Sequence, residues 1–184
     1  MKQVKASMKL SLVSALVLSA TAFNAAAIEV TNKARDIAQR HIIVDSHIDV
    51  PYRINHKWQD VTVATEGGDF DYPRAKQGGL NAPFMSIYIP ASMEGPGKDS
   101  GVQLAHQLID SVEAIQARAP SKFAVAYSTA DVEKHFEQGI ISLPMGMENG
   151  SPIAGSFENL RTFFDRGVRY VTLAHSLSNH ISDS

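Results

Sequence analysis

Apolar and polar residues alternate along the chain in a pattern that predicts strands separated by helices. Four compact apolar runs, at residues 42–46, 82–89, 140–147 and 168–174, predict the principal strands, and the first run is typical of a buried strand. Over residues 102–115 the apolar positions recur every three or four residues, which indicates an amphipathic helix. Strands that alternate with helices predict βα units around a parallel sheet.

Residues that favour helix ends mark two further helices. Ser128 or Thr129 can begin a helix that runs through His135. Ser156 can begin a second helix, which Gly167 ends because glycine readily adopts the left-handed conformation that closes a helix. The sequence therefore predicts short, capped helices before the third and fourth principal strands.

The remaining segments are less regular. Residues 29–40 can form a short helix, and residues 123–127 are a short strand candidate. Gly, Asp and Pro residues predict a long irregular loop over 66–79. Pro144 lies near the middle of the third principal strand, where its missing N–H predicts an irregular pairing pattern.

Composition and charge fit one soluble globular domain. The 184 residues are 44% hydrophobic and carry a formal net charge of −2. Basic residues are scattered and form no stripe interleaved with aromatics, so we expect no nucleic-acid partner. The chain has no cysteine, and an oxidising compartment would therefore neither add nor remove a disulfide.

The first 27 residues have the three-part pattern of a secretory signal peptide. Lysines come first, an apolar run follows, and an A-x-A arrangement ends at Ala27. The apolar run is shorter than the roughly 20 residues that span a bilayer, so we expect no stable membrane anchor. The pattern predicts an exported protein, periplasmic or secreted, whose mature domain is residues 28–184.

His47 and Asp49 stand two residues apart at the end of the first predicted strand. Side chains at that spacing share one face of a strand, and imidazole with carboxylate makes a half-site for a divalent metal, particularly zinc. The pair alone does not distinguish a metal site from a loop residue beside a cap. Asp45 could orient such a ligand, or could bond to nearby backbone.

Glu148 and His175 follow the third and fourth principal strands. In barrels built from βα units, active sites lie at this end of the strands, so three such strand ends together favour a metallohydrolase. A carboxylate at Glu148 could bridge two metals, although a single loop acid could also be structural. The other histidines are isolated and predicted to be structural or exposed: His41, His56, His106, His135 and His180.

Three segments carry a resemblance to a known family. VDSHIDVPYR, FDYPRAKQGGLNAPFMSIYIP, and MENGSPI followed by LRTFFDRGVRYVTLAHSLSNHISDS resemble the membrane (renal) dipeptidases, the zinc dipeptidases of peptidase family M19. The resemblance covers residues 33–184. It implies an α/β fold, a TIM-type (β/α)₈ barrel of the metal-dependent amidohydrolase kind, which holds two zinc ions and hydrolyses dipeptides.

The resemblance also implies roles for the four candidate residues. His47 and Asp49 are expected to bind the first zinc, and Glu148 to bridge both ions. His175 is expected to contact the substrate and to stabilise the oxyanion, while a metal-bridging hydroxide attacks the peptide carbonyl.

Later members of the family's ligand set have no match in this sequence: two histidines that complete the second zinc and an aspartate that takes part in catalysis. We therefore expect residues 28–184 to form the N-terminal half of the barrel, its first four βα units, and to be inactive alone. Open sheet edges would favour a homodimer or a complementing C-terminal half. Two alternatives stay open: another amidohydrolase, acting on lactams or N-acyl amino acids, or a non-enzymatic exported binding or assembly module.

Overall fold

The computed structural model describes residues 30–93 and 100–184, so the predicted signal peptide lies outside the described residues. The helices are α1 Asn32–Arg40, α2 Val50–His56, α3 Tyr72–Gly78, α4 Ser100–Arg118, α5 Thr129–Glu137 and α6 Phe157–Asp165, with 3₁₀ turns η1 Ala91–Met93 and η2 Ser151–Ile153. The strands are β1 Ile43–Ile48, β2 Leu80–Tyr88, β3 Phe123–Val125, β4 Ile141–Leu143, β5 Met145–Glu148 and β6 Val168–Thr172.

The main sheet is parallel and has four strands in the order β1-β2-β5-β6, which confirms the predicted α/β class. Pro144 divides the predicted strand 140–147 in two. The first part, β4, pairs with β3 in a separate two-stranded parallel sheet, whereas β5 lies between β2 and β6. Four adjacent parallel strands with intervening helices are consistent with part of a TIM-type barrel.

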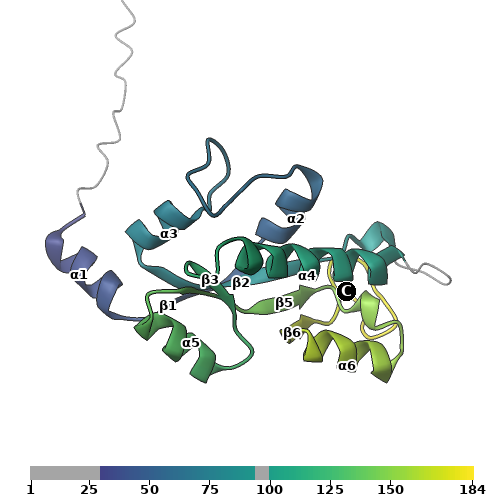
Figure 1. Cartoon of the computed structure of the whole chain (residues 1–184). Helices are drawn as coiled ribbons and strands as arrows, with labels where there is room; N and C mark the ends of the chain where they lie inside the picture. The colour runs from purple at the N-terminus through teal and green to yellow at the C-terminus, as the bar shows by residue number, and fades with distance from the viewer. Residues whose placement is uncertain (1–29, 94–99) are drawn as a thin grey trace, which may run out of the picture.

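The two faces of the main sheet differ in chemistry because neighbouring residues of a strand point to opposite faces. Met85 and Ile87 of β2 and Met147 of β5 are completely buried in the hydrophobic core, together with Leu108 and Ile109 of α4. Figure 1 shows α2, α3 and α4 along the same side of the sheet. The alternate positions carry polar and aromatic side chains at the opposite face, where the functional candidates lie.

The longest helix, α4, contributes one apolar face to this core. Six of the predicted apolar positions are buried at the three-and-four spacing of an amphipathic helix: Leu104, Ala105, Leu108, Ile109, Val112 and Ile115. Gly101 is buried as well, and Val102 is half-buried. Neither α4 nor another helix within residues 30–93 and 100–184 combines the length and apolarity needed to cross a membrane.

The predicted capping residues begin their helices. Ser128 accepts a hydrogen bond from the backbone N–H of Asp131 at the start of α5, and Ser156 accepts one from Asn159 at the start of α6. Beyond α6, Gly167 has φ 108°, a conformation that favours glycine. These two helices were therefore predictable from local sequence.

The first strand is less buried than its sequence predicted. Five of the six residues of β1 are exposed, and Val44 is 54% exposed. The reason is that β1 is an edge of the described sheet and pairs only with β2. A β-branched run indicates a strand, but its burial depends on what covers both of its faces and edges.

The segment 66–79 was also predicted wrongly as loop throughout, because its second half forms α3. Asp71 begins this helix by accepting a hydrogen bond from the backbone of Arg74, and Pro73 is tolerated in the first turn. Gly79 ends it with φ 81°. The helix is short, and the Asp, Pro and Gly residues in and around it favour turns, so the sequence pattern indicated a loop.

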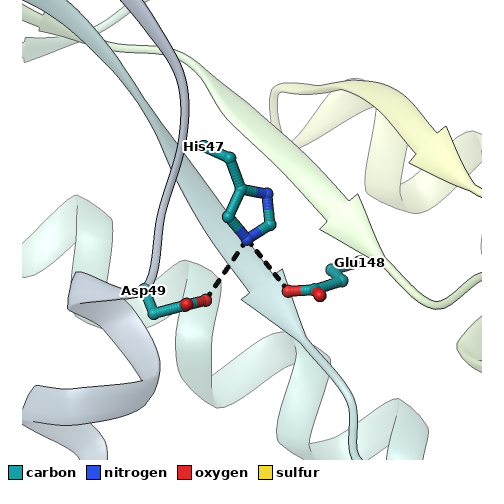
Figure 2. A group of neighbouring side chains, drawn as sticks. All are labelled: His47, Asp49 and Glu148. Carbon is teal, nitrogen blue, oxygen red and sulfur yellow. Dashed lines mark ion pairs between the residues drawn. The ribbon is translucent and has the colours of Figure 1, made fainter. Parts of the chain in front are cut away.

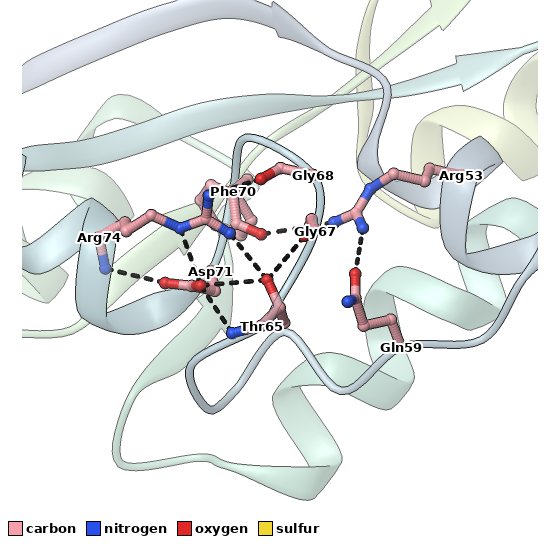
Figure 3. A network of polar contacts seen from close by, with 8 residues as sticks. All are labelled: Arg53, Gln59, Thr65, Gly67, Gly68, Phe70, Asp71 and Arg74. Carbon is pink, nitrogen blue, oxygen red and sulfur yellow. Dashed lines mark hydrogen bonds and ion pairs between the residues drawn. The ribbon is translucent and has the colours of Figure 1, made fainter.

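A polar network around Asp71 fixes the loop before α3 (Figure 3). Asp71 is 1% exposed, and its Oδ2 accepts hydrogen bonds of 2.9 Å from Thr65 N and Arg74 Nε. Burial alone would raise the pKa of Asp71, but these hydrogen bonds hold it well below its usual range. Arg74 also donates to the carbonyl of Gly68, which closes the loop on itself.

Candidate metal centre

Three side chains of metal-ligand type meet at the C-terminal end of the main sheet (Figure 2). His47 lies near the end of β1, Asp49 is the N-cap residue of α2, and Glu148 ends β5. His47 Nε2 is 3.4 Å from Asp49 Oδ1 and 3.0 Å from Glu148 Oε2. The parallel strands bring these residues together because their C-terminal ends meet at one edge of the sheet.

The local chain path differs from the extended strand that the sequence suggested. β1 ends at Ile48, and its register with β2 shifts between Asp45 and Ile48. Asp49 therefore belongs to the turn into α2, yet its carboxylate still faces His47. Asp45 accepts a hydrogen bond of 3.0 Å from the backbone N–H of His47, which agrees with the backbone-bonding alternative.

His175 joins this group from the loop after β6, three residues beyond Thr172. Its Nε2 is 3.1 Å from Glu148 Oε1, and its ring packs edge-on against Tyr88 with centroids 5.3 Å apart. The side chain of His175 is 35% exposed. The structure thus brings together all four residues that the sequence singled out, with Glu148 between the two histidines.

Three further residues around this cluster were not found from the sequence. Ser86 donates a hydrogen bond of 3.0 Å to Glu148 Oε2, Tyr88 packs on His175, and the hydroxyl of Tyr170 lies 3.1 Å from Nδ1 of His47. Ser86 and Tyr88 lie on the face of β2 opposite Met85 and Ile87. The signal available was this alternation along the predicted strands, which places polar and aromatic residues beside the strand-end candidates.

The pKa values of both tyrosines beside the cluster, Tyr88 and Tyr170, are raised. Burial is the largest cause for Tyr88, and the charges of Tyr52, Glu148 and Asp49 raise its pKa further. The pKa of Tyr170 is also raised, first by burial and then by the negative charges of nearby carboxylates. Neutral phenols are therefore available as hydrogen-bonding groups next to the carboxylates.

The three ligand-type residues fit a divalent metal. Their donor atoms all lie within 4.8 Å of one another. Donors about 2.1 Å from a tetrahedral ion lie roughly 3.4 Å apart, close to the observed separations of 3.0 and 3.4 Å. One imidazole and two carboxylates also form a donor set that suits zinc. Within the described ranges this is the one group of three or more such residues.

Other notable features lie away from this cluster. His106 contacts Arg166 between α4 and α6, and His135 lies 3.0 Å from the hydroxyl of Ser142, where burial lowers its pKa. An apolar groove of about 480 Å³ runs along the opposite ends of the strands and includes Val44 and Phe84. In the part of the chain that the structure describes, no group of metal-ligand side chains converges in this groove, so we assign metal binding to the cluster of His47, Asp49 and Glu148.

Comparison with known proteins identifies the family. The family model described as membrane dipeptidase (peptidase family M19) matches residues 31–184. Dipeptidase ataJ from Aspergillus terreus is 32% identical over 162 residues, which cover 83% of this chain and 40% of that protein. The chain therefore spans about 40% of the length of this curated relative.

Two solved structures share the fold. The probable dipeptidase PvdM from Pseudomonas aeruginosa is 23% identical with a TM-score of 0.74, and the alignment covers 83% of this chain and 39% of that one. A metallopeptidase from Rhodobacter sphaeroides, liganded with a phosphinate mimic of the dipeptide L-Ala-D-Ala, is 23% identical with a TM-score of 0.65, covering 75% and 46%. The family match, supported by this shared fold, shows that the chain belongs to the membrane dipeptidase family of metallopeptidases, M19.

Proposed function

We propose that this chain provides part of a zinc-dependent dipeptidase, with His47, Asp49 and Glu148 as metal ligands. The observation that carries the proposal is the convergence of their donor atoms, within 4.8 Å of one another, at the C-terminal end of the sheet. Membership of a metallopeptidase family supports the reaction class. The relatives' names and the dipeptide mimic bound by one of them support a dipeptide as the substrate.

The side chains have separate tasks in this proposal. A bound zinc ion supplies a Lewis acid that polarises a carbonyl and favours ionisation of water. His47, Asp49 and Glu148 would hold the first of two ions, and Glu148 would also contribute to holding a second. Ser86 fixes the orientation of Glu148 through its 3.0 Å hydrogen bond.

His175 is placed to contact the substrate rather than to bind the first ion. Its Nε2 faces the Glu148 oxygen that points away from His47. A dipeptide carbonyl that replaces this contact would accept a hydrogen bond from His175 as negative charge develops on its oxygen. We propose oxyanion stabilisation as the role of His175.

Zinc content tests the ligand assignment directly. Residues 28–184 should retain near-stoichiometric zinc by elemental analysis, and His47→Ala should lose it. His41→Ala is the matched control, because His41 is exposed and lies before β1. Equal zinc in all three proteins would contradict the proposed site.

Substrate class and turnover need separate measurements. We propose that residues 28–184 bind zinc but do not hydrolyse dipeptides alone, since the cluster offers the second ion only Glu148. Calorimetry should show zinc-dependent binding of a phosphinate dipeptide mimic, and weaker binding of N-acyl amino acids. Preference for the N-acyl compounds would contradict the dipeptide assignment, and measurable dipeptide hydrolysis would contradict the proposed inactivity.

The same proposal includes export, which rests on the pattern of lysines, apolar residues and A-x-A in the first 27 residues. Expression in a secreting bacterium should yield a periplasmic or secreted protein. Its N-terminal sequence should begin at Ile28. An unprocessed chain in the cytosol would contradict this part of the proposal.

A further inference from the structure

Tyr170 connects the fourth strand of the main sheet to the first. It lies on β6, yet its hydroxyl is 3.1 Å from Nδ1 of His47 and 3.1 Å from the carbonyl oxygen of Ser46, both on β1. Neighbouring strands are about 4.8 Å apart, so β6 and β1 would be roughly 14 Å apart in a flat four-stranded sheet. That separation exceeds the reach of one side chain, and the contact therefore requires the curvature of this sheet.

The path of the Tyr170 ring depends on a glycine. Gly146 is the register partner of Tyr170 on β5, and a Cβ at Gly146 would lie 2.0 Å from Cζ of the ring. The ring also packs against Phe84 of β2, with centroids 5.3 Å apart. Glycine at position 146 thus leaves the space through which Tyr170 crosses the face of the sheet.

The hydrogen bonds of Tyr170 specify the protonation of the His47 ring. A phenol has one proton, and here it is donated to the carbonyl of Ser46. The hydroxyl oxygen can then act as an acceptor towards Nδ1 of His47, an arrangement that requires the Nδ1–H tautomer. In that tautomer the lone pair belongs to Nε2, the nitrogen that faces Asp49 and Glu148 and would face a bound ion.

We infer that Tyr170 is a positioning residue for the metal centre: it holds His47 in the Nδ1–H tautomer and in the ring orientation that directs the Nε2 lone pair at the ion. The inference rests on the proposed zinc site. Partners of this kind typically change metal affinity by 10- to 100-fold. Tyr170→Phe keeps the ring and its packing on Phe84 but removes the hydroxyl, so it is the informative substitution.

The test compares zinc dissociation constants, measured by chelator competition, for the unchanged chain and Tyr170→Phe. We expect zinc binding about tenfold weaker in the variant. Tyr127→Phe is the matched control, because Tyr127 is 45% exposed and lies at the apolar groove. Circular dichroism checks that each protein is folded.

A second readout separates positioning from a general effect on the sheet. In the zinc-loaded chain, NMR should detect a slowly exchanging Nδ1 proton of His47, assigned by its loss in His47→Ala. In Tyr170→Phe this proton should exchange faster. Gly146→Ala would place a Cβ 2.0 Å from Cζ of the Tyr170 ring, so it should displace the hydroxyl, weaken zinc binding and also speed exchange of this proton.

The outcomes distinguish the two proposals. Unchanged zinc affinity in Tyr170→Phe overturns the positioning role and leaves the zinc site intact. Weaker binding with unaltered exchange of the Nδ1 proton also overturns it, since Tyr170 would then act only on the sheet. Failure of the unchanged chain to bind zinc overturns the proposed site, and the role of Tyr170 with it.

Discussion

Glu148 and His175 are paired at the end of the sheet, with Oε1 of the carboxylate 3.1 Å from Nε2 of the imidazole. The other oxygen of Glu148 is 3.0 Å from His47 Nε2 and 3.0 Å from the hydroxyl of Ser86. Glu148 thus contacts side chains from β1, from β2 and from the loop after β6. Its side chain is 17% exposed, the least exposed of the three ligand candidates.

Replacing Glu148 by glutamine should weaken zinc binding. Glu148→Gln preserves size but removes the charge and one ligand oxygen, so we expect a loss of about 100-fold in zinc affinity by chelator competition. Glu133→Gln, which alters a carboxylate on α5 at the apolar groove, should leave the affinity unchanged. Similar zinc affinities for the two variants would remove Glu148 from the ligand set.

Loss of His175 should affect substrate analogues more than the metal. In His175→Ala the ligands of the first ion remain, but a charge-assisted hydrogen bond to the analogue is lost. We expect binding of the phosphinate dipeptide mimic to weaken about tenfold or more, with zinc content unchanged. His180→Ala, an exposed position in the same segment, is the control. A variant that lost zinc instead would indicate that His175 is itself a ligand.

Asp71 should make a measurable contribution to stability. Asp71→Asn leaves the size nearly unchanged but weakens the hydrogen bonds from Arg74 and Thr65. We expect the free energy of unfolding in urea to fall by about 2–3 kcal/mol. Asp69→Asn, two residues earlier and exposed, should change it by less than about 0.5 kcal/mol. Equal stabilities would mean that the network of Figure 3 does not hold the loop.

The same carboxylate predicts a dependence of stability on pH. The pKa of Asp71 is lower in the folded chain than in the unfolded one, where about 3.9 is usual. Its stabilising effect is therefore fully present above the unfolded pKa and is lost as pH falls towards the folded pKa. Urea unfolding between pH 6 and 2 should show a steeper decline below about pH 4 for the unchanged chain than for Asp71→Asn. Parallel curves would contradict this assignment.

Arg166 should hold α6 against α4. Its Nη2 lies 2.6 Å from Asp110 Oδ1 and 2.9 Å from Glu113 Oε2. Burial disfavours its charged form, but these hydrogen bonds raise the pKa of Arg166 overall. A lysine cannot form this fork, so Arg166→Lys should lower the free energy of unfolding by about 1–2 kcal/mol. Arg161→Lys, at a side chain 76% exposed, should cost no more than about 0.5 kcal/mol, and an equal effect would refute the distinction.

Local chemistry was predictable from the sequence where neighbouring residues decide the structure. The caps at Ser128 and Ser156 and the interruption at Pro144 depend on backbone groups a few positions away. The convergence of Glu148 and His175 was also anticipated, because parallel strands place their ends at one edge. These inferences needed only the order of elements.

Long-range relationships were not predictable in the same way. The exposure of Val44 depends on which strands flank β1, and the contact between Tyr170 and His47 depends on sheet curvature. It also needs the register that places Gly146 beside Tyr170. The sequence shows that one strand contains a glycine and another a tyrosine, but it does not show which residues of the two strands are paired.

The contact between His47 and Tyr170 joins residues 123 positions apart, which has a consequence for how the molecule folds. Closing a chain segment of that length costs conformational entropy, which other contacts of the folded chain must offset. An ion that binds only the completed site would stabilise the folded chain against global unfolding, by about 1.4 kcal/mol for each tenfold excess of zinc over its dissociation constant. Zinc binding would then be coupled to the folding of the whole main sheet, from β1 to β6, rather than to one strand end.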